Sequence, residues 1–265
     1  MWRGRSPNNV VDELEYLVKK YKANGFYIQD DSVSVDVGRL KSICKLIIKK
    51  KLDLKWTTPN GIAHWTLDEE ALDLMKKAGC YRITFGIESG NIEIRKWVGK
   101  PYDLKQATKL TKYANKIGMW TLSTNIIGFP YESREQIEDT VNYAISSDVD
   151  FALFFRLSPR PGTKVYEVFK KEGWLPKNKK YLLSEDIACQ TKFFKPGKLL
   201  EIQNYAYKKF LLARLKDFLN PVRLIRKIKN FEDFLYVTIL GYHGVKMAFS
   251  LIKTKTGITS KVYRS

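Results

Sequence analysis

A polar turn at Glu88-Ser89-Gly90 holds the side chains of this sequence that are best placed to bind a charged ligand. The turn follows a stretch from Tyr81 to Ile87 in which polar and apolar residues alternate, which is the period of a β-strand. Sheets and barrels of parallel strands bind ligands at the carboxyl ends of their strands. A carboxylate and a hydroxyl there could bind an amine or a ligand hydroxyl, although Glu88 could instead cap the helix that follows.

Four other turns have the same character. Each follows a predicted strand and places a polar group beside a glycine or proline that tightens the turn. They are Gln29-Asp30-Asp31, Thr58-Pro59-Asn60-Gly61, Gly128-Phe129-Pro130-Tyr131-Glu132 and Ser158-Pro159-Arg160-Pro161-Gly162-Thr163. Because the carboxyl ends of parallel strands lie on one face, the five turns together predict a ligand-binding face.

Strand and helix patterns alternate between residues 7 and 171. The predicted strands are Phe26–Ile28, Leu54–Thr58, Tyr81–Glu88, Trp120–Ile127 and Phe151–Leu157. The first predicted helix begins at Pro7, with Ser6 as its N-cap, and ends at Asn24-Gly25. The third begins after a Thr66 cap and ends at Gly79. The other predicted helices are Asp36–Lys51, Asp103–Ile117, Ser133–Ser147 and Thr163–Lys171. This alternation predicts an α/β fold with a parallel sheet or barrel. Since the pattern begins on a helix, we expect the first strand to be missing.

The alternation ends near residue 176, so we predict a core from 1 to 176 and a basic, mostly helical C-terminal extension from 177 to 265. Helices are predicted at Leu199–Leu219 and Pro221–Lys229. The segment Phe231–Ile252 is apolar, but its longest uncharged run is 12 residues, whereas a membrane-spanning helix needs about 20. We therefore interpret it as an amphipathic or packing helix.

The positive charge is concentrated in this extension. The whole chain has 47 Lys and Arg against 28 Asp and Glu, a net +19, and the part from Lys177 onward has 19 against 6, a net +13. Such a segment is typical of proteins that bind nucleic acid or an anionic membrane surface, but it also favours solubility without any partner. All three interpretations stay open at this point.

The cysteines indicate a reducing compartment. Cys44, Cys80 and Cys189 are too far apart for a metal-ligand or redox pair, and no apolar leader follows Met1. We therefore expect a cytoplasmic protein, either free or bound peripherally at a membrane.

Three strand-end motifs in this order resemble the radical S-adenosylmethionine (radical SAM) enzymes, and most closely the branch associated with cobalamin-binding domains. The motifs are G-I-E-S-G at 86–90, I-I-G-F-P-Y-E-S at 126–133 and S-P-R-P-G-T at 158–163. Residues 2–13 are similar to the segment that follows the cluster-binding loop in that branch, and residues 75–80 are similar to its helix-to-strand joint. The likeness covers about Trp2 to Pro176.

The resemblance implies an incomplete (β/α)6 barrel of the partial TIM type, without the first strand and the cluster loop. It implies S-adenosylmethionine and a [4Fe–4S] cluster as cofactors, with cobalamin held by a domain outside this sequence. In that family the reduced cluster cleaves S-adenosylmethionine to a 5′-deoxyadenosyl radical, which serves methylation or another C–H functionalisation. The resemblance also implies a small-molecule or lipid-like substrate and an electron donor such as flavodoxin or ferredoxin.

The resemblance also implies which residues of the first strand ends bind the cofactor. Asp30 and Asp31 match the motif that holds the methionine amino group, with which a carboxylate pairs well. Glu88 and Ser89 match the motif that contacts the ribose hydroxyls or the methionine carboxylate.

Two later strand ends complete the implied cofactor site. Asn125 and Gly128 match the motif in which the backbone approaches the cofactor closely, which favours glycine. Leu157, Ser158 and Pro159 match the motif that contacts the adenine.

The cluster ligands depart from the family pattern. Cys44, Cys80 and Cys189 lack the family's spacing and lie beyond the place that the ligands should occupy, and iron–sulfur ligation needs thiolates. We therefore expect the chain to be the C-terminal part of a longer protein and inactive on its own, with no metal ligands of its own.

Two rival functions stay open. The first is a basic module that binds RNA or an anionic membrane through residues 177–265, with nucleic acid ranked below the membrane. The second, ranked last, is an aldolase-type barrel without a cluster. It would need a lysine at a strand end for Schiff-base chemistry, and the sequence shows none.

Several single residues have two interpretations each. His64 could transfer protons or bind substrate, or lie exposed in a loop. Arg156 and Arg160 could bind a carboxylate or phosphate, or form surface ion pairs. His243 is interpreted as a packed residue. Aromatic residues that could line a cavity, but more often belong to a core, are Trp56, Trp65, Trp120 and Phe155.

Overall fold

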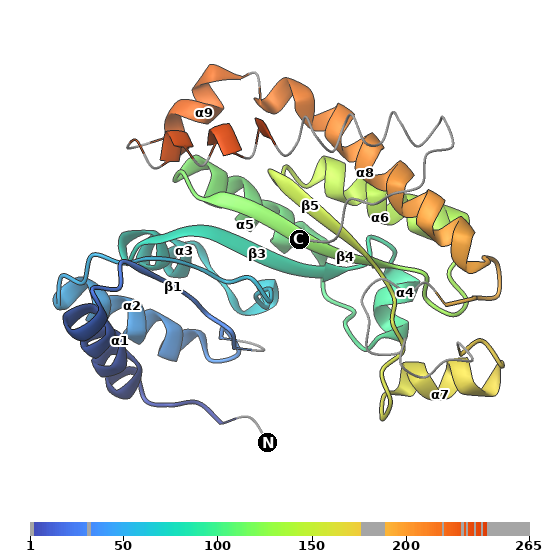
Figure 1. The fold of residues 1–265 in the computed structure, drawn as a ribbon, viewed down its shortest axis with the longest axis horizontal. Coiled ribbons are helices and arrows are strands. Elements are labelled where there is room, and N and C mark those ends of the chain that lie inside the picture. Colours follow the sequence, from blue (N-terminus) through green and yellow to red (C-terminus); the bar gives the residue numbers. More distant parts are fainter. Residues whose placement is uncertain are drawn as a thin grey trace. The chain divides into compact units, whose positions relative to one another are not determined.

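A computed structural model describes residues 3–30, 33–175, 189–218, 220–228, 231, 233–235, 237–239, 241 and 242. Its five-stranded sheet has the order β1-β2-β3-β4-β5 (Figure 1). The strands are β1 (Gly25–Tyr27), β2 (Lys55–Thr57), β3 (Cys80–Glu88), β4 (Trp120–Ile127) and β5 (Phe151–Arg156). Consecutive strands pair in parallel, as for β1 with β2 and β3 with β4. The predicted α/β fold of the partial TIM-barrel type is confirmed.

Helices connect the strands. They are α1 (Pro7–Tyr21), α2 (Val37–Lys49), η1 (His64–Thr66), α3 (Glu69–Lys77), α4 (Ile92–Trp97), α5 (Leu104–Lys116), α6 (Arg134–Ser146), α7 (Lys164–Lys171), α8 (Pro196–Phe218) and α9 (Pro221–Lys227). Figure 1 shows α1 beside α2, and these two helices pack on each other. The short helix α4 follows Glu88, as the alternative role of Glu88 as a helix cap assumed, but the sequence analysis gave no bounds for it.

The helix starts show where local signals were sufficient. Ser6 caps α1, because its hydroxyl accepts a hydrogen bond of 3.3 Å from the Asn9 amide, as predicted. The predicted Thr66 cap of α3 is wrong. Asp68 caps that helix by accepting a 2.7 Å bond from the Ala71 amide, while the Thr66 hydroxyl donates to Ala63 O.

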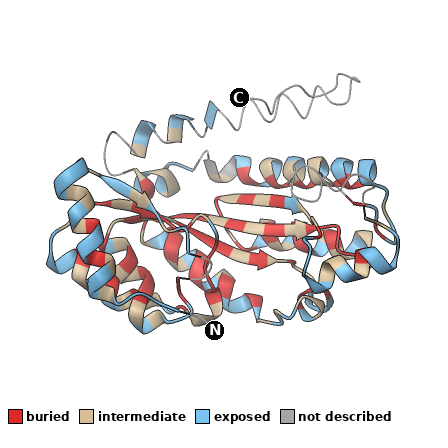
Figure 2. Cartoon of the chain, turned by 60° about the horizontal axis from the view of Figure 1, so that its bottom comes forward, coloured by how far each residue is buried: buried red, intermediate tan, exposed pale blue. Residues whose placement is uncertain are grey.

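The chain divides into two compact units. Unit 1 consists of residues 1–125 and 142–153, and unit 2 of residues 126–141 and 154–265. The predicted boundary between 176 and 177 stays a prediction. Figure 2 shows buried residues along the strands and on one side of the helices. The core of unit 1 has large buried side chains from strands and helices alike, among them Leu40, Trp56, Leu72, Met75 and Phe85.

In unit 2, α8 packs on the end of β5. The α8 side chains Leu199, Ile202, Ala206 and Phe210 are buried. Two α8 side chains also bond to the backbone of Phe154, since Gln203 Nε2 donates to its carbonyl over 2.5 Å and the Tyr207 hydroxyl accepts from its amide over 3.1 Å. The predicted helix near 199–219 is therefore confirmed as part of a packed unit.

None of the helices in the described ranges is both long enough and apolar enough to cross a membrane.

Candidate cofactor site

The turn after β3 holds Glu88 in an unusual backbone conformation. Glu88 has φ 65°, in the left-handed region that non-glycine residues rarely adopt, and the register of β3 on β4 shifts between Gly86 and Glu88. Its half-buried carboxylate pairs with Lys100 Nζ at 2.6 Å. Such strained backbone is found mostly at functional sites. The alternative role of Glu88 as a helix cap is wrong, because the side chain of Asn91 caps α4.

Asn125 on β4 is the register partner of Glu88. The Asn125 side chain is fully buried, and its Nδ2 donates to Ser123 Oγ over 3.0 Å and to Leu153 O over 3.1 Å. These two bonds fix the amide orientation, and Oδ1 has no hydrogen-bond partner among the residues that the structure describes. A buried acceptor left unpaired costs about 1–3 kcal/mol. Oδ1 is therefore suited to accept a hydrogen bond from a ligand.

Ser89 contributes to the shape of the same turn. Its buried hydroxyl accepts from the Asn91 amide over 3.1 Å. The guanidinium of Arg95 donates to the carbonyls of Ser89 and Gly90 over 3.0 and 2.8 Å. Burial lowers the pKa of Arg95. The structure thus brings Glu88, Ser89 and Asn125 together at neighbouring strand ends.

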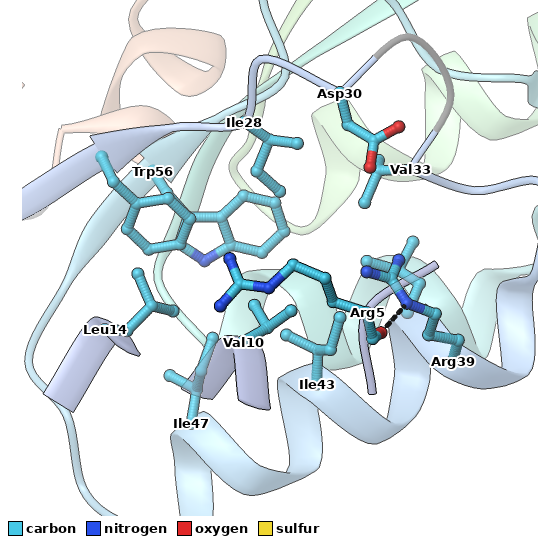
Figure 3. A pocket seen from close by; sticks show the side chains of 12 residues that line it. Arg5, Val10, Leu14, Ile28, Asp30, Val33, Arg39, Ile43, Ile47 and Trp56 are labelled. Carbon is cyan, nitrogen blue, oxygen red and sulfur yellow. Dashed lines mark hydrogen bonds between the residues drawn. The ribbon is translucent and has the colours of Figure 1, made fainter. Parts of the chain in front are cut away.

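Asp30 lies at a separate pocket in unit 1, which has a volume of about 160 Å³ (Figure 3). The wall is mainly apolar, and Arg5 and Arg39 also line it. Arg39 Nε donates to the Arg5 carbonyl over 2.7 Å. Asp30 is exposed at the rim of this pocket. The predicted partner Asp31 lies outside the described residues.

In unit 2 the ends of β4 and β5 are adjacent, because the Leu157 amide donates to Ile127 O over 2.9 Å. Ser158 follows half-buried and Pro159 buried. Gly128 has φ 87°, and an added Cβ would lie 3.1 Å from Leu199 Cδ1. Glycine at 128 is therefore required by the turn and by the packing of α8, in addition to any approach of a cofactor.

Glu132 was not assigned a role from the sequence, yet it organises this turn. Its Oε2 accepts from the amides of Gly128 and Phe129 over 2.6 and 3.2 Å, and its Oε1 is buried without a partner in the described part of the chain. Burial raises the pKa of Glu132 to about 8, although the two amide bonds oppose the shift. The sequence feature that could have indicated this role is a glutamate four residues after the turn glycine, Gly128.

His64 is buried, so its interpretation as an exposed loop residue is wrong. Only 2% of its surface is exposed, and neither ring nitrogen has a partner among the described residues. Burial, reinforced by the positive charge of Arg95, lowers the pKa of His64 to about 4. The neighbouring Trp65 and Tyr102 rings stack with centroids 3.6 Å apart. His64 is therefore neutral in the folded protein.

We expect His64 to make the protein acid-sensitive. Its pKa is about 4 when folded and 6.5 when exposed, so its neutral form stabilises the fold fully above pH 6.5 and loses that effect as the pH falls through 4. Urea unfolding from pH 6.5 down to 4 should show that the wild type loses about 3 kcal/mol of stability relative to a variant that cannot titrate at this position. His64→Phe, which keeps a ring but cannot titrate, should lose much less. Equal losses would contradict this assignment.

Among the other aromatic and basic candidates, Trp56, Trp120 and Arg156 have structural roles, whereas Phe155 is exposed. Trp56 and Trp120 are core residues, and Trp56 Nε1 donates to Ala78 O over 2.8 Å. Arg156 donates to Gln203 of α8, and Arg160 is exposed. His243 lies outside the described residues.

The described residues do not fit an iron–sulfur cluster. Cys44, Cys80 and Cys189 are buried free thiols. Burial raises the pKa of Cys44 to about 12, that of Cys189 to about 11, and that of Cys80 as well, whereas a cluster needs thiolates. Within the described ranges, no group of three or more His, Cys, Asp or Glu could hold a metal ion.

Residues 2–144 match the family model of the radical SAM superfamily. The chain belongs to this superfamily. This match confirms the superfamily that was predicted from the sequence. The superfamily is named for its cofactor, S-adenosylmethionine. Membership makes the chain part of an enzyme family and leaves the aldolase-type alternative without support.

Two curated relatives are methyltransferases by name. An uncharacterized methyltransferase of Pyrococcus horikoshii is 31% identical over 235 residues, which are 88% of this chain and 49% of the relative. Cytidylyl-2-hydroxyethylphosphonate methyltransferase of Streptomyces wedmorensis is 36% identical over 180 residues, 65% of this chain and 33% of the relative. The chain thus spans half or less of the length of these two relatives.

A solved structure shares the fold. It is the radical S-adenosylmethionine methyltransferase TsrM of Kitasatospora setae, with cobalamin and a [4Fe–4S] cluster bound. The similarity has a TM-score of 0.53 at 20% identity and covers 57% of this chain and 29% of that one. It supports the partial-barrel fold.

Proposed function

We propose that this chain is the S-adenosylmethionine-binding part of a radical SAM methyltransferase of the cobalamin-associated branch. The superfamily match and the methyltransferase relatives support the proposal. The whole enzyme would catalyse methylation or another C–H functionalisation, for which one-electron reductive cleavage of S-adenosylmethionine would provide the 5′-deoxyadenosyl radical and methionine. Because the described residues do not fit a cluster, the ligands must come from elsewhere in the enzyme, together with an electron donor, and the chain alone is inactive.

The observation that carries this proposal is the pairing of Glu88 with Asn125 across β3 and β4. Glu88 offers a carboxylate for ribose hydroxyls, and Asn125 Oδ1 is a buried acceptor for which the described part of the chain supplies no donor. The Lys100 side chain is 45% exposed, and a pair this exposed is worth at most about 1 kcal/mol. A ligand hydroxyl could therefore displace Lys100 at little cost.

Equilibrium dialysis of the chain against labelled S-adenosylmethionine tests the site. We expect saturable binding by the wild type and roughly tenfold weaker binding by Glu88→Gln, which keeps the shape but removes the charge-assisted bonds. Glu93→Gln is the matched control, because Glu93 on α4 also pairs with a lysine, Lys96, at 3.0 Å. Absence of saturable binding, or equal weakening by Glu93→Gln, would refute the proposed site.

A further inference from the structure

The last part of unit 2 exposes an apolar face with helical spacing. The described residues between 231 and 242 are helical, and none of them is buried (Figure 2). The large exposed side chains of this segment recur at intervals of three and four residues, which places them along one side of a helix. They are Phe231, Phe234, Leu235, Ile239 and Tyr242, with Phe231 76% and Tyr242 64% exposed.

A basic helix precedes this apolar face in the chain. Within residues 221–230 there are four basic residues and no acidic one. On α9 the apolar side chains of Val222 and Ile225 are 56% and 69% exposed, and Arg226 between the helix turns is exposed as well. Arg223 is half-buried and lies 3.9 Å from Asp217, and Lys227 is buried, so Arg226 is the exposed cation of α9. The face at 231–242 has no lysine or arginine.

This combination fits a lipid surface better than a nucleic acid. Nucleic acid is bound mainly through its phosphates, and the exposed apolar side chains between 231 and 242 offer a phosphate no cation. An amphipathic helix at a bilayer buries its apolar side chains at the acyl boundary, while arginine and lysine contact anionic headgroups. A bilayer would therefore bind both the exposed apolar side chains and the exposed positive charge of this segment.

We propose that α9 and residues 231–242 form a docking surface for an anionic lipid bilayer, on which the protein binds peripherally. The apolar side chains insert into the acyl boundary, and the exposed Arg226 of α9 contacts the anionic headgroups. The whole extension from Lys177, with its net charge of +13, adds long-range attraction. This inference does not depend on the proposed function.

Sedimentation of the full chain with vesicles tests the docking surface. The vesicles contain phosphatidylcholine alone or mixed with phosphatidylglycerol. We expect the wild type to pellet with the mixed vesicles only, and less so as salt is raised. Phe234→Ser/Leu235→Ser/Ile239→Ser should lower the bound fraction at least tenfold. Arg226→Glu, which leaves the Arg223–Asp217 pair intact, should lower it several-fold and weaken the salt dependence.

Two control variants make the same changes elsewhere. Tyr16→Ser/Tyr21→Ser removes exposed aromatic rings from α1, and Lys105→Glu/Lys112→Glu reverses two exposed charges on α5. Both should bind as the wild type does, and circular dichroism should show native helix content for all variants.

Four outcomes would overturn the proposal. They are no pelleting of the wild type, equal pelleting with neutral vesicles, equal losses in the controls, and retention of an RNA oligonucleotide on filters in place of vesicle binding. A concentration-dependent dimer that the serine variant abolishes, without vesicle binding, would also overturn it and would assign the face to a second copy of the chain.

Discussion

Gly79→Ala is expected to destabilise the protein by about 3–5 kcal/mol, enough to unfold much of a marginally stable domain. Gly79 has φ 94°, and an alanine Cβ there would lie 1.8 Å from Leu54 O. The left-handed conformation alone costs about 1–2 kcal/mol for alanine, and the clash adds a backbone displacement. Because the Gly79 carbonyl accepts from the Trp56 amide over 3.1 Å, that displacement would separate β2 from β3.

Gly99→Ala is the matched control for this measurement. Gly99 also ends a helix and has φ 77°, but nothing lies within 4 Å of an added Cβ. Its cost should be only the conformational part, about 1–2 kcal/mol. Urea unfolding followed by circular dichroism measures both variants. Equal losses for the two glycines would show that the contact with Leu54 yields easily and that the close approach of α3 to β2 is not important.

Glu132→Gln is expected to stabilise the protein at slightly alkaline pH by several kcal/mol. The pKa of Glu132 is about 8 in the folded protein and 4.5 when exposed. The unfolded chain therefore releases this proton first. The contribution of Glu132 to stability is greatest below pH 4.5 and falls as the pH rises through 8, by roughly 1.4 kcal/mol per pH unit. Glutamine keeps an acceptor for the amides of Gly128 and Phe129 and carries no titrating proton, so its stability should not fall.

The window from pH 6.5 to 8 isolates this effect, because the stabilising contribution of His64 is complete above pH 6.5. Glu135→Gln is the control, since Glu135 is an exposed carboxylate near the start of α6. That variant should follow the wild-type pH profile within about 0.5 kcal/mol. A wild-type profile that is flat between pH 6.5 and 8 would mean that Glu132 is ionised in the fold.

The sequence alone determined the order of elements, the parallel α/β class and the superfamily. Strand alternation, helical spacing and caps such as Ser6 depend on neighbours within a few residues, so they can be predicted from the sequence without a structure. Even there competition between nearby groups matters, because Asp68 and not Thr66 caps α3. The strand-end motifs are local as well, which is why they carried the family resemblance.

The tertiary structure decided which of those residues are coupled and how they are charged. The register of β3 on β4 places Glu88 beside Asn125, and burial by distant segments sets the protonation of His64 and Glu132. The requirement for glycine at position 128 comes partly from Leu199, which lies far along the chain. Register, burial and close contacts join residues that are remote in the sequence, and a desolvated group's pKa depends on all of them, so no local pattern contains this information.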